Sequence, residues 1–247
     1  MNRDSFTQKL YADLCQGKIP AIIIPNFLDS VRCQRIASQI LNSKTSSGCG
    51  LAEKIGESVN SYISNKIEYF KNVKVSNRYL NQIFLNDDPR EMMLKEISKL
   101  TKKKIQFAKE NLTSYSQGII RCHALGDAVH IHRDNAYFDA PEFSVSKLSD
   151  QMSAVLHLQS SESGGELTIY DKFWSDNDER FRNPEFGYTN NVVNGICMHK
   201  VRPKQGDLVI INPKKYHSVN AIKGKIKRIT FGFFFGRKSE SNFYAWS

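Results

Sequence analysis

The sequence has few cysteines and no long apolar run, and both shortages exclude whole classes of protein. The cysteines are odd in number and scattered, and no two form a Cys-x-x-Cys pair, which argues against a disulfide framework or a zinc ribbon and favours a reducing cytosol. No stretch has the apolar length of a membrane span, and the polar segment Met1–Ser5 leads into nothing like a signal peptide. We therefore expect a cytoplasmic protein with no membrane segment. The cysteines are Cys15, Cys33, Cys49, Cys122 and Cys197.

Acidic residues are also scarce relative to basic ones. Lys and Arg number 35 against 25 for Asp and Glu, so the formal net charge is +10. Such an excess suits an anionic partner, which could be a nucleic acid, a nucleotide, an acidic carrier protein or a carboxylate-bearing metabolite, and a solvated basic surface explains it equally well. The basic residues are spread along the chain without a zinc-finger, homeodomain or RNA-recognition signature, so we do not expect nucleic acid to be the partner.

The first part of the chain, residues 1–116, reads mainly as helical. The β-branched run at residues 21–25 is typical of one covered strand. Three apolar patterns predict helices, and the third begins at a capping carboxylate and a proline. With 247 residues and 40% apolar content, the chain suits one domain in which this part supports a larger core. The expected helices cover residues 31–41, residues 60–70 and about twenty residues from Asp87-Asp88-Pro89 through Ile105.

From residue 117 the pattern changes to short strands separated by Gly and Pro. Helices first and strands afterwards indicate an α+β protein, and eight short strands suit a double-sheet jelly roll over residues 117–247. Residues 171–194 form a long polar interruption that contains four aromatic side chains, and we expect an ordered flap there, which we interpret as a lid. The expected strands are 118–123, 128–132, 153–159, 166–170, 195–201, 207–211, 217–222 and 227–235.

The fragment His130-Ile-His132-Arg133-Asp134 is the most informative in the chain. His132 and Asp134, with the distant His217, supply two imidazoles and one carboxylate, the set that holds non-haem Fe(II) on one face and leaves the opposite face open. Alternatively, His130, His132 and His217 form a three-histidine site, or all are ordinary polar residues at a strand end. Arg228-Ile229-Thr230 favours the first interpretation, because an Arg and a Thr on one face of a strand can clamp a carboxylate.

In this order and spacing, the motifs resemble those of the Fe(II)/2-oxoglutarate-dependent oxygenases, over roughly residues 117–236. The segment Gly164-Gly-Glu-Leu-Thr-Ile-Tyr-Asp171, followed by Trp174, is similar to the branch that contains free amino-acid hydroxylases and alkaloid and amino-acid halogenases. The resemblance implies a double-stranded β-helix, Fe(II) bound by the two histidines and Asp134, and 2-oxoglutarate and dioxygen as co-substrates. It also implies that Arg228 and Thr230 bind the distal carboxylate of 2-oxoglutarate.

The residue at position 134 predicts the outcome of the reaction. In the related halogenases the equivalent residue is small and has no carboxylate, which leaves room on iron for chloride. Asp134 fills that position here, so the resemblance implies hydroxylation.

Four residues are weaker candidates for contact with the substrate. Arg121 precedes the metal-binding strand and could meet an anionic substrate or 2-oxoglutarate, although a surface ion pair explains it equally well. His130 and His157 could line the cavity, or could be ordinary interior or rim histidines. Trp174 could cover the substrate or anchor the flap. The aromatic C-terminus, residues 243–246, could close over a cationic ligand or pack on the barrel.

Several functions compete at this level. The leading hypothesis is a hydroxylase of a small molecule, such as an amino acid or a related biosynthetic intermediate. The alternatives are oxidative dealkylation of nucleic-acid bases, for which the second Arg typical of that branch is replaced by Phe234, and hydroxylation of a carrier- or peptide-bound substrate. A metal-binding jelly-roll module without enzyme activity is the non-enzyme alternative. The sequence predicts neither the substrate nor the oligomeric state.

Overall fold

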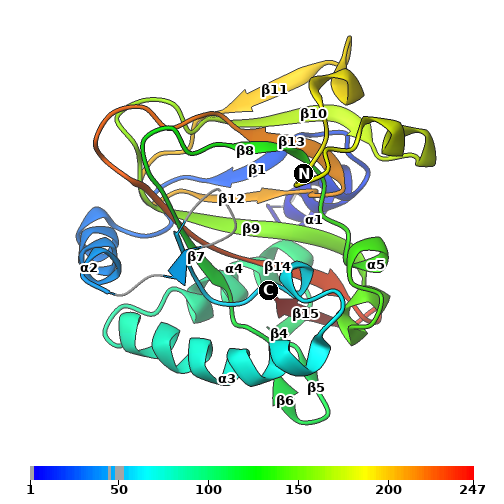
Figure 1. Cartoon of the computed structure of the whole chain (residues 1–247). Coiled ribbons are helices and arrows are strands. Elements are labelled where there is room, and N and C mark those ends of the chain that lie inside the picture. The colour runs from blue at the N-terminus through cyan, green and yellow to red at the C-terminus, as the bar shows by residue number, and fades with distance from the viewer. Residues whose placement is uncertain (1–2, 44–45, 48–52) are drawn as a thin grey trace.

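The protein is built from two facing β-sheets, with most of its helices on the outer side of the larger sheet (Figure 1). The computed structural model describes residues 3–43, 46–47 and 53–247. Among them, Cys15, Cys33, Cys122 and Cys197 are free thiols, and Cys49 lies outside the described residues. No helix of this part of the chain is both long enough and apolar enough to cross a membrane.

All strand pairings within the two sheets are antiparallel except one, between β15 and β4. In hydrogen-bonding order, the large sheet contains β1 (Ala21–Ile24), β12 (Leu208–Ile211), β9 (Ser149–Gln159), β14 (Arg228–Arg237), β7 (Ile119–His123), β3 (Glu53–Ile55) and β2 (Ser46–Ser47). Beside β14 lie β15 (Asn242–Trp246) and then β4 (Lys104–Phe107). The small sheet contains β11 (Met198–Val201), β10 (Leu167–Phe173), β13 (Lys215–Val219) and β8 (Val129–His132), and β5 (Lys109–Glu110) pairs only with β6 (Thr113–Ser114).

The mixture of helices and antiparallel sheets confirms the α+β prediction, and each of the eight expected strands corresponds to an observed one. The aromatic C-terminus is an additional strand, β15, in which Phe243 and Trp246 are buried, so these side chains pack in the interior. Strands from the first 116 residues extend the large sheet, because β1 pairs with β12 and β3 pairs with β7. The division of the chain at residue 116 stays a prediction.

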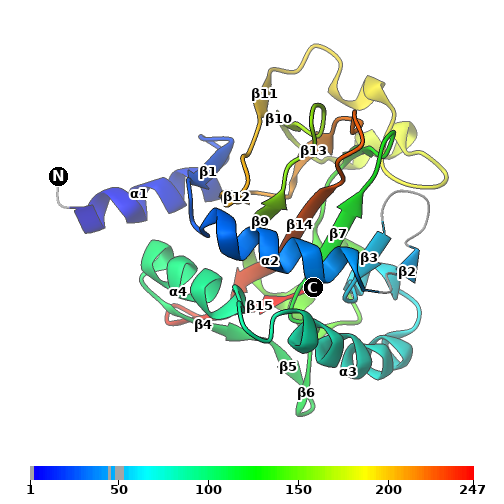
Figure 2. The ribbon, with the colours of Figure 1, turned by 90° about the vertical axis from the view of Figure 1, so that its left-hand side faces the viewer.

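The helices differ more from their predicted limits. They are α1 (Arg3–Cys15), α2 (Ser30–Leu41), α3 (Lys66–Ile83) and α4 (Arg90–Thr101), all labelled in Figure 2, and the short α5 (Ala136–Asp139), labelled in Figure 1.

The predicted helix at 60–70 was wrong at its start. The Asn65 side chain accepts from the Glu68 backbone N–H at 3.1 Å and so begins α3 at Lys66. The predicted continuation of α4 to Ile105 was also wrong, because Lys102 is left-handed with φ +57° and residues 104–107 pair with β15 instead.

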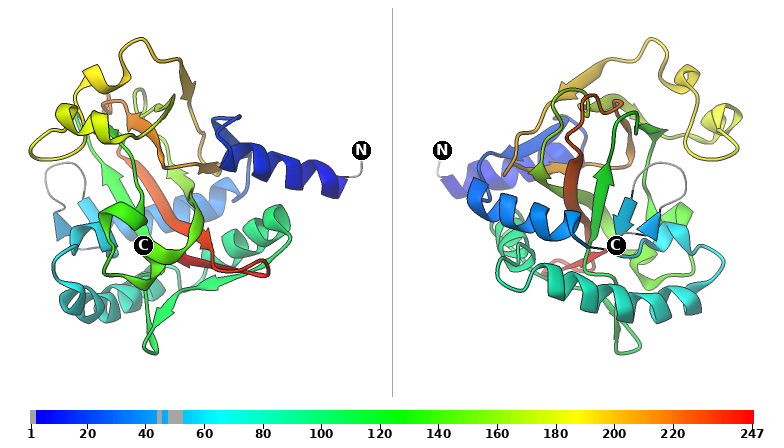
Figure 3. Two further views of the ribbon diagram at one scale, coloured as in Figure 1. Left: turned by 90° about the vertical axis from the view of Figure 1, so that its right-hand side faces the viewer. Right: turned by 60° about the vertical axis from the view of Figure 1, so that its left-hand side comes forward.

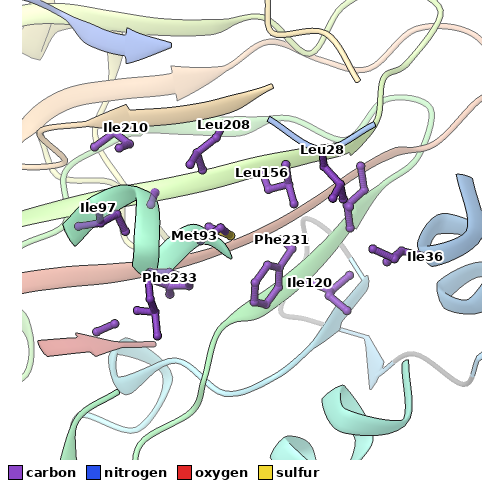
Figure 4. Packing of buried hydrophobic residues seen from close by; sticks show 14 of the residues in the cluster. Leu28, Ile36, Met93, Ile97, Ile120, Leu156, Leu208, Ile210, Phe231 and Phe233 are labelled. Carbon is purple, nitrogen blue, oxygen red and sulfur yellow. The ribbon is translucent and has the colours of Figure 1, made fainter. Parts of the chain in front are cut away.

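The main hydrophobic core lies between the large sheet and α1 to α4 (Figure 4). Ile120 and Cys122 of β7 and Ile229 and Phe231 of β14 belong to it. Side chains alternate along a strand, so the residues between them face the small sheet instead. A separate apolar cluster that includes Ile169 fills part of the space between the two sheets. The remaining part of that space contains the candidate site.

Candidate metal centre

His132, Asp134 and His217 converge where β8 ends. His132 and His217 are direct partners in the pairing of β8 with β13, so both side chains lie on the same face of the small sheet. Asp134 follows β8, and its backbone N–H donates to the Pro213 carbonyl at 2.8 Å. Its Oδ2 lies 3.7 Å from His132 Nε2 and 3.6 Å from His217 Nε2. The three ligand atoms lie within 4.8 Å of one another, so this group, the triad, could hold a metal ion.

Backbone carbonyls determine which nitrogen of each triad histidine is available to a metal. Nδ1 of His132 lies 2.8 Å from the His130 carbonyl oxygen, and Nδ1 of His217 lies 2.9 Å from that of Lys215. A carbonyl oxygen only accepts hydrogen bonds, so each Nδ1 carries the proton and each Nε2 keeps a lone pair. Both lone pairs are on the side of the Asp134 carboxylate, an orientation typical of metal-binding histidines.

The protonation states of the triad also suit a cation. Burial and the neighbouring His217 lower the pKa of His132 to about 4, so its imidazole is neutral at pH 7. Burial alone would raise the pKa of Asp134, but the hydrogen bond with His217 and the electrostatic effect of the two histidines and Arg121 outweigh it and lower this pKa to about 2. Asn60 Nδ2 lies 3.4 Å from Asp134 Oδ1, the other carboxylate oxygen. Two imidazoles and one carboxylate are the ligand set expected for Fe(II).

A second group of side chains lines the inner face of the large sheet. Arg228 and Thr230 are two residues apart on β14; Arg228 lies opposite His123, and Thr230 lies opposite Arg121, both on β7. His157 on β9 lies opposite Thr230 from the other side. Paired residues share a face of the sheet, so these five form one group, which we call the cationic cluster. The cationic cluster lies close enough to the triad for the charge of Arg121 to help lower the pKa of Asp134.

Among the described residues, no acidic side chain forms an ion pair with the two guanidinium groups of the cationic cluster. Burial, together with nearby Arg121, lowers the pKa of Arg228 to about 10. The Arg121 side chain is exposed to solvent, yet desolvation by the surrounding protein lowers its pKa as well. Neither guanidinium forms an ion pair or hydrogen bond with the described residues, and the buried Nδ1 of His123 has no hydrogen-bond partner either. An unpaired buried cation such as Arg228 is costly, so the cluster suits a ligand that carries carboxylates, as 2-oxoglutarate does.

The other predicted residues lie in different surroundings. His130 is exposed and is not part of the triad; only its carbonyl serves the site, so the three-histidine alternative was wrong. His157 is buried in the cationic cluster, where burial and Arg228 lower its pKa well below the usual value. The ring centroids of Trp174 and Phe138 are 4.9 Å apart, and Trp174 Nε1 donates a hydrogen bond to Glu179 Oε1 at 2.7 Å. These contacts hold the flap against α5.

The flap, residues 171–194, packs against the small sheet, and its first three residues, predicted to lie outside a strand, continue β10 to Phe173. It contains two short 3-10 helices, and Tyr188 and Val192 belong to a cluster with Ile131 and Tyr216 of the small sheet. In Figure 3 it lies over the small sheet, on the side away from α3 and α4. Gly187 fits against β8 because it has no Cβ, which would lie 2.4 Å from the Ile131 carbonyl oxygen. Whether the flap moves as a lid stays a prediction.

Sequence reasoning missed two residues next to the triad. The ring of Phe186, in the flap, lies 5.1 Å from the ring of His132, and Asn60 contacts Asp134 from a 3-10 turn (Val59–Ser61). Neither residue belongs to a sequence motif that points to the metal, because each reaches the site through a contact with residues far away in the sequence. His123 could have been found, since it shares a face with Arg121 on a predicted strand.

Comparisons with known proteins agree with this geometry. The model of the family described as carrier-protein-independent halogenase WelO5 matches residues 5–247. The leucinostatins biosynthesis cluster protein S of Purpureocillium lilacinum is 30% identical over 138 residues, which span 53% of this chain and about half, 56%, of that protein.

Solved structures show the likeness of the fold. An N-substituted L-amino acid dioxygenase from Burkholderia ambifaria AMMD has a TM-score of 0.64 at 14% identity, over 97% of this chain and 91% of that one. HygX from Streptomyces hygroscopicus, solved with nickel and 2-oxoglutarate, has a TM-score of 0.56 at 13% identity, over 96% of this chain and 88% of that one. The match over almost the whole chain shows that the protein belongs to the carrier-protein-independent halogenase WelO5 family of Fe(II)/2-oxoglutarate-dependent oxygenases.

Proposed function

We propose that this oxygenase hydroxylates an aliphatic C–H bond of a small molecule, and that Asp134 determines this outcome. Its Oδ2 stands 3.6 to 3.7 Å from both histidine Nε2 atoms, so it is placed to be the third protein ligand. In related halogenases a small residue without a carboxylate leaves that position free for chloride. With a carboxylate there, transfer of a hydroxyl group to the substrate is the expected reaction, although the family model carries a halogenase name.

In this proposal each group of side chains has a separate task. Nε2 of His132, Nε2 of His217 and the Asp134 carboxylate hold Fe(II). Arg228 and Thr230 bind the distal carboxylate of 2-oxoglutarate through charge-assisted hydrogen bonds. Bound iron, with 2-oxoglutarate and dioxygen, supplies the oxidising power that breaks the C–H bond. The Phe186 ring covers one side of His132 and reduces the access of water to that side. Both sheets then serve as the two walls of a double-stranded β-helix, the architecture that we propose for this core.

The substrate is inferred to be a carboxylate-bearing small molecule such as an amino acid or its derivative. Arg121 supports this inference, because it lies on the face of β7 that looks toward the small sheet and forms no ion pair with any residue that the structure describes. The fold likeness to a dioxygenase of N-substituted L-amino acids points in the same direction. The description of the family as carrier-protein-independent favours a free substrate over one tethered to an acidic carrier.

Anaerobic spectroscopy followed by a turnover screen tests the proposal. Addition of Fe(II) and 2-oxoglutarate without oxygen should produce the visible charge-transfer band of the iron-bound keto acid. Amino acids and N-substituted amino acids are then screened, with oxygen, for succinate release. Products are weighed by mass spectrometry with and without chloride. A gain of one oxygen atom in both conditions supports hydroxylation, and a chlorinated product from the unmodified protein would contradict the assignment of Asp134.

A further inference from the structure

A second group of metal-binding side chains lies on the small sheet, apart from the triad. Asp171 belongs to β10, His199 belongs to β11, and Cys197 immediately precedes β11. Their ligand atoms all lie within 4.8 Å of one another. The Asp171 backbone N–H donates to the Cys197 carbonyl at 2.9 Å, which fixes the two strands side by side at this point. Cys197 and His199 are two residues apart and therefore share a face with Asp171.

The register of the sheet shows that this group is separate from the triad. Ile169 lies opposite His217 on β13 and opposite His199 on β11. The two histidines therefore occupy one row across the strands, with Ile169 between them. Neighbouring strands are about 4.8 Å apart, so the backbones of His199 and His217 are separated by roughly 10 Å. A metal ion held by His199 cannot use the ligands of the triad.

We propose that Asp171, Cys197 and His199 bind a zinc ion. Thiolate and imidazole are ligands that Zn²⁺ prefers, and three protein ligands leave its fourth position to water. Asp171 and Cys197 are exposed, so water reaches the site and the side chains have room to adjust. Lys215 Nζ holds the other carboxylate oxygen, Oδ1, at 2.8 Å and keeps Asp171 in place. Binding deprotonates Cys197, and the released proton goes to solvent.

The existing contacts require only a small change to accept the ion. His199 Nε2 lies 2.9 Å from Asp171 Oδ2, joined by a hydrogen bond. A tetrahedral zinc ion with ordinary bond lengths separates nitrogen and oxygen ligands by about 3.3 Å, and sulfur from either by about 3.6 Å. The ion would thus replace the shared hydrogen, with the imidazole and carboxylate moving apart by a few tenths of an ångström. His199 then carries its single ring proton on Nδ1, and any second ring proton is released to solvent. The exposed Cys197 side chain then closes the remaining gap by rotation.

A zinc ion at this site would connect the two ends of the flap. Asp171 is the first residue of the flap, and Cys197 and His199 follow closely after its last residue, 194. One ion bound by all three would join the two ends of the flap with metal–ligand bonds. In the absence of zinc, the backbone hydrogen bond between Asp171 and Cys197 and the side-chain hydrogen bond between Asp171 and His199 make this connection.

Titration of the metal-free protein with Co²⁺ as a probe tests the site without any need for activity. A thiolate ligand gives tetrahedral cobalt a near-ultraviolet charge-transfer absorption that imidazole and carboxylate do not give. Wild-type protein should bind two equivalents and show this band, and Zn²⁺ should abolish it by displacement. Cys197→Ser should lose the band and one equivalent, and His217→Ala should lose the other equivalent and keep the band.

A matched control separates this thiol from the other cysteines. Cys15→Ser removes a thiol that lies in no group of potential ligands among the described residues, and the band should be unchanged. A wild-type protein without the band, or a Cys197→Ser variant that keeps it, would overturn the proposal. Amide hydrogen exchange over residues 172–194 tests the effect on the flap. Exchange should slow when Zn²⁺ is added to wild type but not to Cys197→Ser, and equal rates in the two proteins would refute the link.

Discussion

Replacement of Arg228 should weaken the binding of 2-oxoglutarate without harming the fold. The guanidinium is buried, its pKa is lowered to about 10 by burial and by Arg121, and no described carboxylate pairs with it. A charge-assisted hydrogen bond contributes about 1.5–3 kcal/mol. At about 1.4 kcal/mol for each factor of ten, Arg228→Met should therefore raise the dissociation constant roughly ten- to a hundredfold. Desolvation of the guanidinium is already complete in the free protein, which favours the upper end of this range.

Calorimetric titration with 2-oxoglutarate under anaerobic conditions, in the presence of Fe(II), measures this loss. The same substitution removes an unpaired buried charge, so the melting temperature without co-substrate should not fall. Arg228→Lys should recover only part of the affinity, because an ammonium group cannot form the forked contact. Arg237→Met is the matched control, since Arg237 lies on the same strand but is exposed and pairs with Asp150 at 2.7 Å. Unchanged affinity in Arg228→Met would refute the reasoning and make Arg121 the next candidate for the clamp.

Three further predictions concern the triad and its surroundings. Alanine at His132, Asp134 or His217 should abolish succinate formation with the melting temperature little changed, and turnover at the wild-type rate would exclude that residue as a ligand. Asp134→Gly should mostly inactivate the enzyme, because opening a position for chloride on iron does not place the substrate beside that position. Mass spectrometry of the products formed in chloride checks this prediction, and efficient chlorination would contradict it. Burial lowers the pKa of His123 to about 3, so between about pH 6.5 and 4 the unfolded chain takes up a proton that the folded protein does not. Stability should therefore fall with decreasing pH by about 1.4 kcal/mol per unit for this residue, and His123→Asn should remove that part of the slope in metal-free melts.

The predictions from sequence were most accurate where the chain repeats a short pattern. The Arg-x-Thr motif favoured an inward Arg228, and the structure buries Arg228 on the face that looks toward the small sheet, whereas for Arg121 the sequence left an inward position and a surface ion pair equally open. The His-x-Asp spacing and the distant His217 identified three residues that the structure brings within reach of one ion. Patterns of this kind depend on neighbours in sequence, so a single chain is enough to read them.

Structural features that depend on contacts between residues far apart in the sequence could not be predicted from these short patterns. The helical pattern up to Ile105 is interrupted because residues 104–107 pair with β15, which lies far away in sequence. Asn60 and Phe186 stand beside the triad only after the turn and the flap have packed against it. The apolar spacing around residues 60–70 did not predict the cap at Asn65, because the cap depends on one side chain.

The three triad residues are not attached to the fold in the same way. The pairing of β8 with β13 fixes the positions of His132 and His217. A shift in the register of either strand would therefore displace the small sheet as well. Asp134 lies beyond the end of β8, and its link to Pro213 uses only a backbone N–H, which every residue other than proline provides. A single codon change at this position can therefore exchange the third ligand while both imidazoles keep their places. Evolution can thus vary the chemistry at the metal without rebuilding the scaffold, which fits the presence of a carboxylate at this position in a family named for halogenation.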